Sequence, residues 1–244
     1  MKNLTYATLA LILVVLATSA CTINLTTGSG KVKTETRSVN GFSGVQFAGL
    51  GELNISQGAA EGLTIEGEDN ILPKIITEVR SGILYIGFDR ENWQDMVRPT
   101  RNLVFTLKVK NLNSLDLSGL GNVTMPKLSA DALSVKVSGA GGVKIAQISA
   151  KTVTSAMSGA GNVDLAGKIT SQTLTLTGLG NYSVGDLESQ TGSISLSGAG
   201  GATVWAKDAL NVKISGAGTV SYYGSPKVTK DISGLGVVNS LGNK

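Results

Sequence analysis

Apolar and polar residues alternate in short runs that recur about every 20 residues over most of this chain. A small polar residue followed by Gly-x-Gly marks each recurrence, and the first glycines of seven copies fall at 119, 139, 159, 178, 198, 216 and 234. The second and fourth residues before each first glycine, and the fourth and sixth after it, are apolar almost throughout. This period of two predicts two short strands per unit, each with one buried face, joined across the glycines.

The repeat also predicts how these strands pack. One unit cannot bury its apolar faces alone, but stacked units can, with each strand parallel to its equivalent about 4.8 Å away. We therefore predict an all-β fold, a parallel β-helix (solenoid) with rungs of about 20 residues. The glycines would form corners where backbones approach closely and adopt unusual angles. The Leu or Ala between them is interpreted as a corner residue of restricted size, and the preceding Ser or Thr as part of a hydroxyl ladder that caps the turn.

Three departures from the pattern can be interpreted within this fold. Lys230 and Ser240 interrupt the inward columns in the last rung, where a polar cap is expected. Ser155 is the one interior break, and we expect its hydroxyl to bond to the backbone.

Outward positions predict contacts between neighbouring rungs. Asp116 would neighbour Lys136, and Lys213 would neighbour Asp231, so opposite charges would meet in both places. Exposed pairs of this kind contribute roughly a few tenths of a kcal/mol each. Their main value is that they test the register.

An eighth copy of the motif, Ala48 to Gly51, opens a section in which the spacing is irregular. Residues 52–117 still contain strand-like segments, and Ser81 and Gly82 indicate a hairpin turn between two of them. We predict one β-helix domain over 35–244, irregular at 35–111 and regular at 112–244.

A polar segment over residues 89–101 carries one tryptophan and three arginines. These residues are Trp93, Arg90, Arg98 and Arg101. We expect a surface loop whose tryptophan packs back on the rod, and the alternative is a ligand-binding loop.

The N-terminus has the pattern of an export signal. Lys2 supplies a positive start, residues 4–17 are almost entirely apolar, and small residues precede Cys21, the only cysteine. The apolar stretch is short for a spanning helix and typical of a signal peptide. We predict a signal peptide at 1–20, lipid attachment at Cys21, and an anchored tether at 21–34. The alternatives are secretion with cleavage after Ala20, or an uncleaved anchor.

Composition narrows the class of protein. The chain has 244 residues, with 32 Gly, 4 Pro and a net charge of +4. This composition excludes collagen and low-complexity coil and fits many tight turns. Lys and Arg are scattered without a run of five, so we expect no nucleic-acid partner.

Candidate catalytic chemistry is sparse. The chain has no His, which removes Ser-His-Asp and Cys-His catalysis and the commonest zinc ligand. Acidic residues of the repeats sit at different offsets within their rungs, which disfavours a paired-carboxylate site or a calcium cage. No helix is predicted after any Gly-x-Gly copy, which argues against phosphate binding. We therefore predict no catalytic, cofactor-binding or metal-binding residues. The acidic residues considered are Asp116, Asp131, Asp164, Asp186, Glu188, Asp208 and Asp231.

Several segments carry a resemblance to a known family. They are residues 37–45 (RSVNGFSGV), 67–72 (GEDNIL), 82–86 (GILYI) and 112–123 (LNSLDLSGLGNV), with the later Ser-Gly-Ala-Gly copies. The chain resembles the bacterial family described as putative auto-transporter adhesin, head GIN domain, over roughly residues 35–240. The resemblance implies a right-handed β-helix, often on a lipoprotein, and brings no catalytic residues with it.

These observations together predict a non-catalytic, surface-tethered β-helix that binds a glycan or a protein. The alternatives are a structural module of the cell envelope and a polysaccharide-active β-helix enzyme. We expect an exported protein held to the membrane through lipidated Cys21, on the outer membrane if the host has one.

Overall fold

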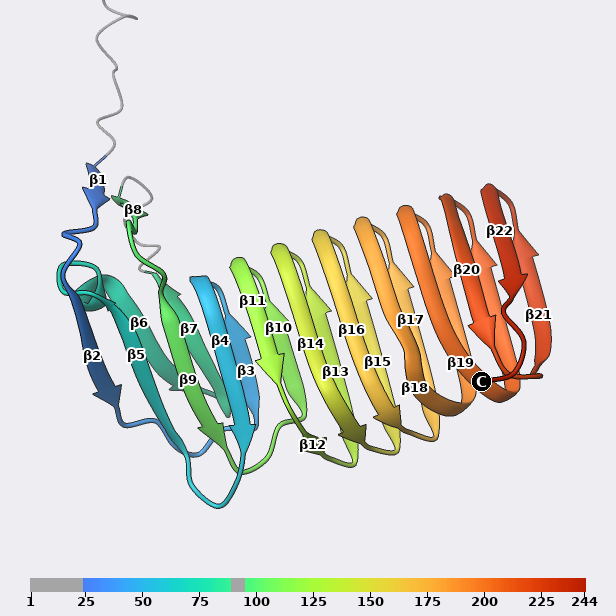
Figure 1. Cartoon of the computed structure of the whole chain (residues 1–244), viewed down its shortest axis with the longest axis horizontal. Helices are drawn as coiled ribbons and strands as arrows, with labels where there is room; N and C mark the ends of the chain where they lie inside the picture. The colour runs from blue at the N-terminus through green and yellow to red at the C-terminus, as the bar shows by residue number, and fades with distance from the viewer. Residues whose placement is uncertain (1–23, 89–94) are drawn as a thin grey trace, which may run out of the picture.

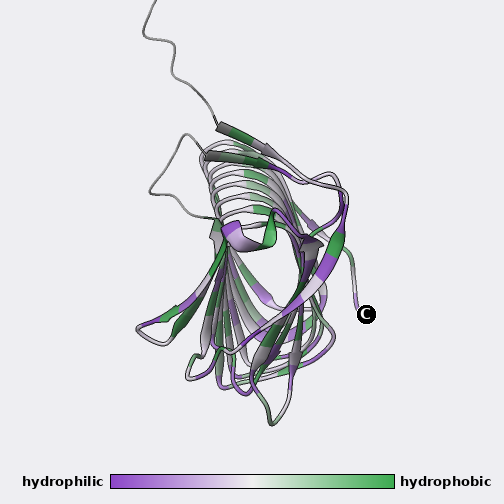
Figure 2. Cartoon of the chain, turned by 90° about the vertical axis from the view of Figure 1, so that its left-hand side faces the viewer, coloured by the Kyte–Doolittle hydropathy of each residue, from purple (hydrophilic) through white to green (hydrophobic). Residues whose placement is uncertain are grey.

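The chain coils into an elongated rod with two facing walls of strands (Figure 1). The computed structural model describes residues 24–88 and 95–244. The N-terminal strands lie at one end of the rod and the last rung lies at the other. Seen along the rod, the turns superimpose one behind another (Figure 2). The predicted fold class, a β-helix with rungs of about 20 residues, is confirmed.

Each rung contributes one strand to each wall. We call the wall that precedes the glycines face A and the wall that follows them face B. Face A contains β3 (Gly44–Phe47), β10 (Ser114–Leu117), β13 (Ala132–Val137), β15 (Thr152–Met157), β17 (Ser171–Leu176), the C-terminal parts of β18 (Leu179–Leu196) and β19 (Ala199–Ile214), and β21 (Lys227–Ile232). Face B contains β4 (Leu50–Gln57), β11 (Leu120–Met125), β14 (Ala140–Ser149), β16 (Ala160–Lys168), the N-terminal parts of β18 and β19, β20 (Ala217–Tyr223) and β22 (Leu235–Ser240). The short strand β12 (Leu128–Ser129) connects the end of β11 on face B with the start of β13 on face A, on the side of the rod away from the glycine corners.

The register between rungs is the predicted one. On face A, Leu115 pairs with Val135, Val135 with Ser155, and Ser155 with Leu174, all in parallel. The inward columns form one continuous apolar core along the rod. The period of the sequence therefore sets the stacking directly, because each strand meets its own equivalent in the next unit.

The irregular N-terminal strands continue both walls. β3 and β4 pair in parallel with β10 and β11, and β7 (Ile83–Phe88) and β9 (Val104–Val109) extend the same sheet. Beyond them the pairing becomes antiparallel. The antiparallel additions are β2 (Val32–Arg37), β5 (Gly62–Glu68) and β6 (Ile75–Arg80), and a 3-10 helix, η1 (Leu72–Lys74), joins the last two.

The predicted turn at Ser81 and Gly82 is a hairpin between β6 and β7, and both residues have positive φ. A separate small sheet was not predicted. It pairs β1 (Asn24–Thr27) in parallel with β8 (Asp95–Arg98).

The glycine corners are required mainly because backbones come close together. A Cβ placed on Gly139 would lie 2.8 Å from the carbonyl carbon of Ser118 and still closer to the carbonyl oxygen of Gly119. The same clash recurs at the first glycine of each later rung. The predicted close approach is therefore confirmed. Positive φ occurs within the motif only at Gly51, Gly141 and Gly180, so unusual angles are a secondary reason.

Two expectations about the corner are wrong. From Leu120 onward, the Leu or Ala between the glycines is exposed, at 59% for Leu120 and 62% for Leu179, so the core does not restrict its size in the regular rungs. Leu50, in the irregular section, is partly buried against the core. The hydroxyl ladder is also absent from the described residues, where only Thr177 of that column bonds to the preceding rung, through the Met157 carbonyl at 3.4 Å. Backbone bonds hold the turn instead, because its amides point along the rod to carbonyls of the preceding rung.

The interior is mostly apolar, with a buried Gln172–Ser189 hydrogen bond and one hydroxyl without a partner among the described residues. Phe47 and Phe105 pack edge-to-face at 5.2 Å near the N-terminal end. Ser155 is fully buried, but its Oγ has no hydrogen-bond partner among the described residues. The expectation of a backbone bond is therefore wrong. Its column neighbours are Val135 and Leu174, so the hydroxyl faces apolar groups.

The last rung is less polar than predicted. Lys230 and Ser240 are exposed there, as expected of a cap. However, Ile232, Leu235 and Val237 are also exposed, at 41%, 88% and 52%. The polar cap is therefore incomplete.

Charges on neighbouring rungs follow the register. Lys213 and Asp231 form the predicted ion pair at 3.4 Å. Asp116 and Lys136 are in register, but they form no ion pair within 4.0 Å, so that contact is not confirmed. Instead, Asp116 is half-buried and one of its oxygens lacks a hydrogen-bond partner among the described residues.

Candidate functional site

A trough runs along the outer surface of face B. It consists of two adjoining hollows of about 400 and 420 Å³, which share Asn162 and Asp164. Because the hollows share these two residues, the trough is continuous across several rungs. We call it the outer trough. Its remaining lining residues are Glu52, Asn122, Val123, Thr124, Gly142, Val143, Lys144, Asn181, Tyr182, Ser183, Gly201, Ala202, Thr203, Thr219 and Ser221.

Two glycines contribute to the depth of the outer trough. Gly142 lies in register between Asn122 and Asn162, and Gly201 follows Asn181 in the same column. A Cβ at either glycine would lie 3.1 Å from the amide oxygen of the preceding asparagine. These glycines do not belong to the Gly-x-Gly corners. Their missing side chains leave room beside the asparagine amides.

The polar groups of the outer trough are mostly neutral amides and hydroxyls. Asn181 accepts a hydrogen bond from the Gly201 amide at 3.1 Å, and Thr124 donates to Asn54 at 2.6 Å. One ion pair joins adjacent rungs within the trough, between Lys144 and Asp164 at 3.7 Å.

The only aromatic residue of the trough turns its side chain inward. Tyr182 is 1% exposed, and its hydroxyl donates to the Thr175 carbonyl at 3.2 Å. Burial raises the pKa of this phenol. The trough therefore offers hydrogen bonds to a ligand but no exposed ring for stacking.

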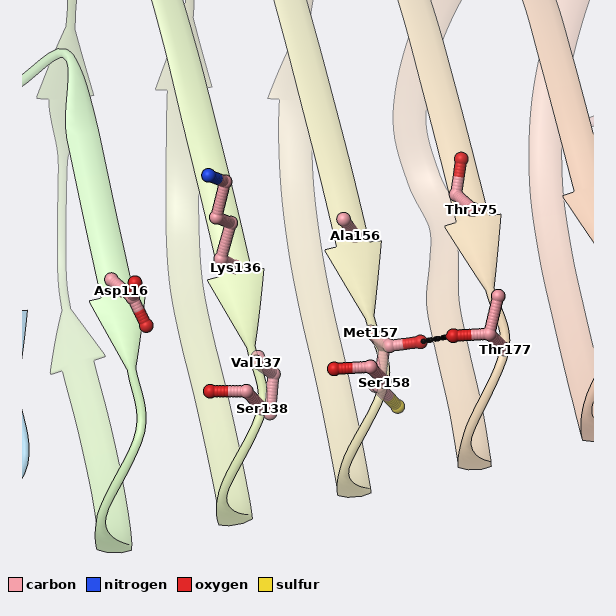
Figure 3. Close-up of a pocket in the computed structure, with 9 residues that line it drawn as sticks. All are labelled: Asp116, Lys136, Val137, Ser138, Ala156, Met157, Ser158, Thr175 and Thr177. Atoms are coloured by element: carbon pink, nitrogen blue, oxygen red, sulfur yellow. Dashed lines mark hydrogen bonds between the residues drawn. The ribbon is translucent and has the colours of Figure 1, made fainter.

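Face A carries a smaller hollow of about 250 Å³ (Figure 3). Asp116 lies at one side of it and Lys136 on the next rung, with Thr175 and Thr177 further along. Burial raises the pKa of Asp116, and Lys136 opposes that effect. The unpartnered oxygen of Asp116 is itself buried, so it cannot reach a ligand in this hollow.

The acidic residues do not assemble into a reactive pair. Within the described residues, no group of three or more His, Cys, Asp or Glu side chains could hold a metal ion. Glu188 lies between Lys168 and Lys207, 3.3 Å from each ammonium, and Lys207 followed by Lys168 lowers the pKa of Glu188. Asp186 is paired with Lys244. These two neighbouring carboxylates are therefore neutralised separately.

One buried charge was missed by sequence reasoning. Glu68 is fully buried and accepts hydrogen bonds from the hydroxyl and amide of Thr100 and the amides of Gly30 and Arg101. The Thr100 hydroxyl, together with these amides, lowers the pKa of Glu68 to about 2. Asp69 follows it and accepts a bond from the Ser29 hydroxyl.

This network fixes the N-terminal segment to the body of the rod. Asn70 adds a bond from its side-chain amide to the Thr27 carbonyl at 2.8 Å. The Gly-Glu-Asp-Asn segment at 67–70 therefore has a structural role. The only signal in the sequence was two adjacent acids at a strand end, a pattern that does not reveal their partners.

Two predicted features lie outside the described residues. The signal peptide at 1–20 and Cys21 lie wholly outside them, and the polar segment at 89–101 lies partly outside them, with Arg90 and Trp93 in the part that is not described. In the rest of that loop, Arg98 closes β8 and the Arg101 amide bonds to Glu68. Residues 95–101 therefore take part in strand pairing and in the hydrogen bonds around Glu68.

The stacked rungs define a β-solenoid protein with a long polar outer trough. The chain belongs to the family described as "Putative auto-transporter adhesin, head GIN domain", whose model matches residues 41–226. No curated protein matches the sequence.

Solved structures share the whole fold. A putative adhesin from Bacteroides fragilis is 26% identical, with a TM-score of 0.84 over 88% of this chain and 100% of that one. A putative adhesin from Parabacteroides merdae is 19% identical, with a TM-score of 0.72 over 89% and 99%. A putative lipid binding protein from Parabacteroides distasonis is 21% identical, with a TM-score of 0.71 over 89% and 100%. The last two likenesses concern the fold alone.

Proposed function

We propose that this chain is a non-catalytic, exported binding protein that holds an extended glycan in the outer trough. The observation that carries the proposal is the continuity of the trough across rungs, with side-chain amides or hydroxyls on most of them; the rung of Gly142 and Lys144 has neither. A ligand with hydroxyl groups at regular intervals can both donate to and accept from such groups. The rung spacing of about 4.8 Å sets the interval.

The charges of the trough favour a neutral ligand over a strongly charged one. Lys144 and Asp164 offset each other and Glu52 is the other charged lining residue, so the trough lacks the basic stripe that a nucleic acid requires. An extended polypeptide is the second candidate, because the same groups can bond to peptide amides. Its residues advance by about 3.3 Å, so fewer of them fall in step with the rungs.

A binding role also fits the surroundings of the acidic residues better than catalysis does. Glycosidic cleavage in most enzyme families uses two facing carboxylates, one of them protonated. Asp164 has Lys144 and Ser183 as its register neighbours, and Glu188 is held by two lysines. The polysaccharide-active alternative therefore has no supporting cluster among the described residues.

We further propose that a lipid on Cys21 tethers the rod to the cell envelope. The adhesin description of the family is that of a surface protein. In the part of the chain that the structure describes, no helix is long and apolar enough to span a membrane. β1 begins at Asn24, at the end of the rod remote from the last rung. A short tether would then leave the outer trough accessible.

The proposal is tested by filling the trough. Gly142→Tyr places a ring where the side chain is missing, and Thr173→Tyr adds the same ring at an exposed position on face A. After a glycan array identifies a ligand, calorimetry should show affinity reduced at least about tenfold, or 1.4 kcal/mol, by the first change and unaltered by the second. The absence of any glycan ligand on the array would overturn the proposal. Release of reducing ends from a bound polysaccharide would favour the enzyme alternative.

A further inference from the structure

The last rung has a free sheet edge. β22 pairs with β20 on one side, and no other strand within 24–88 or 95–244 pairs with its opposite side. Figure 1 places this edge at the far end of the rod from β1. A free edge presents unpaired amide and carbonyl groups, which form a template for another strand.

Part of the core is also exposed at this rung. Ile232 occupies the column of Met157 and Leu176, which are 1% and 2% exposed, whereas Ile232 is 41% exposed. On β22, the inward residue Val238 is only partly buried, whereas Val220 in the same column of the preceding rung is fully buried. The core is therefore open in cross-section at this end, as though a further strand layer belonged there.

The two strands of the last rung differ in charge. β21 carries Lys227, Lys230 and Asp231, which discourage edge pairing. β22 has the sequence LGVVNS, without a charge, a proline or a bulge. Only β22 is therefore unprotected at this end.

The opposite end of the rod is protected. Its outermost strand on one side, β2, carries Lys33, Glu35 and Arg37, and β6 carries Glu78 and Arg80. Continuous head-to-tail stacking of copies is disfavoured because β22 would meet these charged edges.

The segment after β22 turns away from the free edge. The Leu241 amide donates to the Tyr222 carbonyl, and the Gly242 carbonyl accepts from the Gly224 amide, so both bonds are made to the preceding rung. The Lys244 ammonium lies 4.8 Å from the Tyr223 ring centre and 5.7 Å from that of Trp205. The edge of β22 is left uncovered by its own neighbours in sequence.

We propose that β22 pairs antiparallel with β22 of a second copy of this chain, giving a two-fold, tail-to-tail dimer. A two-fold axis sets each residue of 235–240 opposite a residue of the same strand. Since β22 has no charged residue, no charge within 235–240 meets its twin across the axis. The contact covers Leu235, Val237 and Ile232 and does not use the outer trough. The dimer proposal can therefore be tested independently of glycan binding.

The test compares two lysine substitutions in the full chain, purified in detergent. Val237→Lys places a charge on the free edge, and Leu179→Lys places one at a similarly exposed corner of an interior rung. Sedimentation with the detergent contribution subtracted should give twice the monomer protein mass for the parent chain and Leu179→Lys. Val237→Lys should give the monomer mass at the same micromolar concentrations.

A second measurement separates loss of pairing from loss of folding. Far-ultraviolet circular dichroism should be the same for all three proteins. Amide hydrogen exchange across 235–240 should slow as the concentration of the parent chain rises, and should not slow for Val237→Lys. A parent chain that is monomeric throughout, a dimer that survives Val237→Lys, or open-ended filaments would each overturn the proposal.

Discussion

Replacing Gly139 with alanine tests the reason for the glycine corners. The new Cβ would lie 2.8 Å from the carbonyl carbon of Ser118, and closer to the oxygen of Gly119. Carbon atoms pack best at about 3.5–4.0 Å, so adjacent rungs must separate locally by about 0.7 Å or more. The strain arises from the neighbouring rung, because φ at Gly139 lies outside the left-handed region.

The expected cost follows from the bonds at that corner. The amides of Ser138 and Gly139 donate to the Leu117 carbonyl at 3.0 and 3.1 Å, and the Ala140 amide donates to Gly119 at 3.1 Å. Separation by about 0.7 Å takes these bonds beyond useful length. Losing three bonds at about 0.5–1.5 kcal/mol each, with overpacking of about 1–3 kcal/mol, lowers the free energy of unfolding by about 2.5–7.5 kcal/mol.

The matched control is Gly62→Ala in β5. A Cβ there meets nothing within 4 Å, so the change should be neutral or stabilise by about 0.4–1 kcal/mol. Urea unfolding followed by circular dichroism gives the midpoint and the slope for each variant, and the slope shows whether rungs unfold separately. Equal midpoints for the two variants would refute close approach as the reason for the glycine.

Two further changes test the buried polar groups. Ser155→Ala removes an unpartnered hydroxyl from the apolar core and should raise the free energy of unfolding by about 1 kcal/mol in the same urea assay; a loss of stability would reveal a partner for that hydroxyl. Glu68 has a folded pKa of about 2, below its ordinary value of 4.5, so its stabilisation is complete above pH 4.5 and is lost as the pH falls toward 2. Glu68→Gln should therefore lower the melting temperature at pH 7 and flatten its decline between pH 4.5 and 2; an unchanged slope would show that other groups control acid unfolding.

The proposed binding site lies on the outer surface, away from the residues that recur most often. The repeated Gly-x-Gly corners serve the close stacking of rungs. The depth of the outer trough depends on Gly142 and Gly201. These glycines stand in a column that has asparagine at Asn122, Asn162 and Asn181. Variation within the repeat is thus where a ligand preference can arise while the fold is kept.

The repeat in the sequence was sufficient to predict the rungs, their parallel pairing and their register. Each strand meets its own equivalent, so the columns that include Leu115, Val135 and Leu174 can be aligned by counting alone. The pair of Lys213 and Asp231 follows from the same count. Local periodicity carries this information because every contact in a solenoid is with the next unit.

Only the tertiary structure decided the features that lack a period. The antiparallel strands β2 and β5, the pairing of β1 with β8, and the burial of Glu68 join segments tens of residues apart with no repeated spacing. The exposure of Ile232 likewise depends on which neighbour is absent, although its column is apolar elsewhere. Sequence periodicity determines which residues can stack, whereas burial also depends on what lies above and below them.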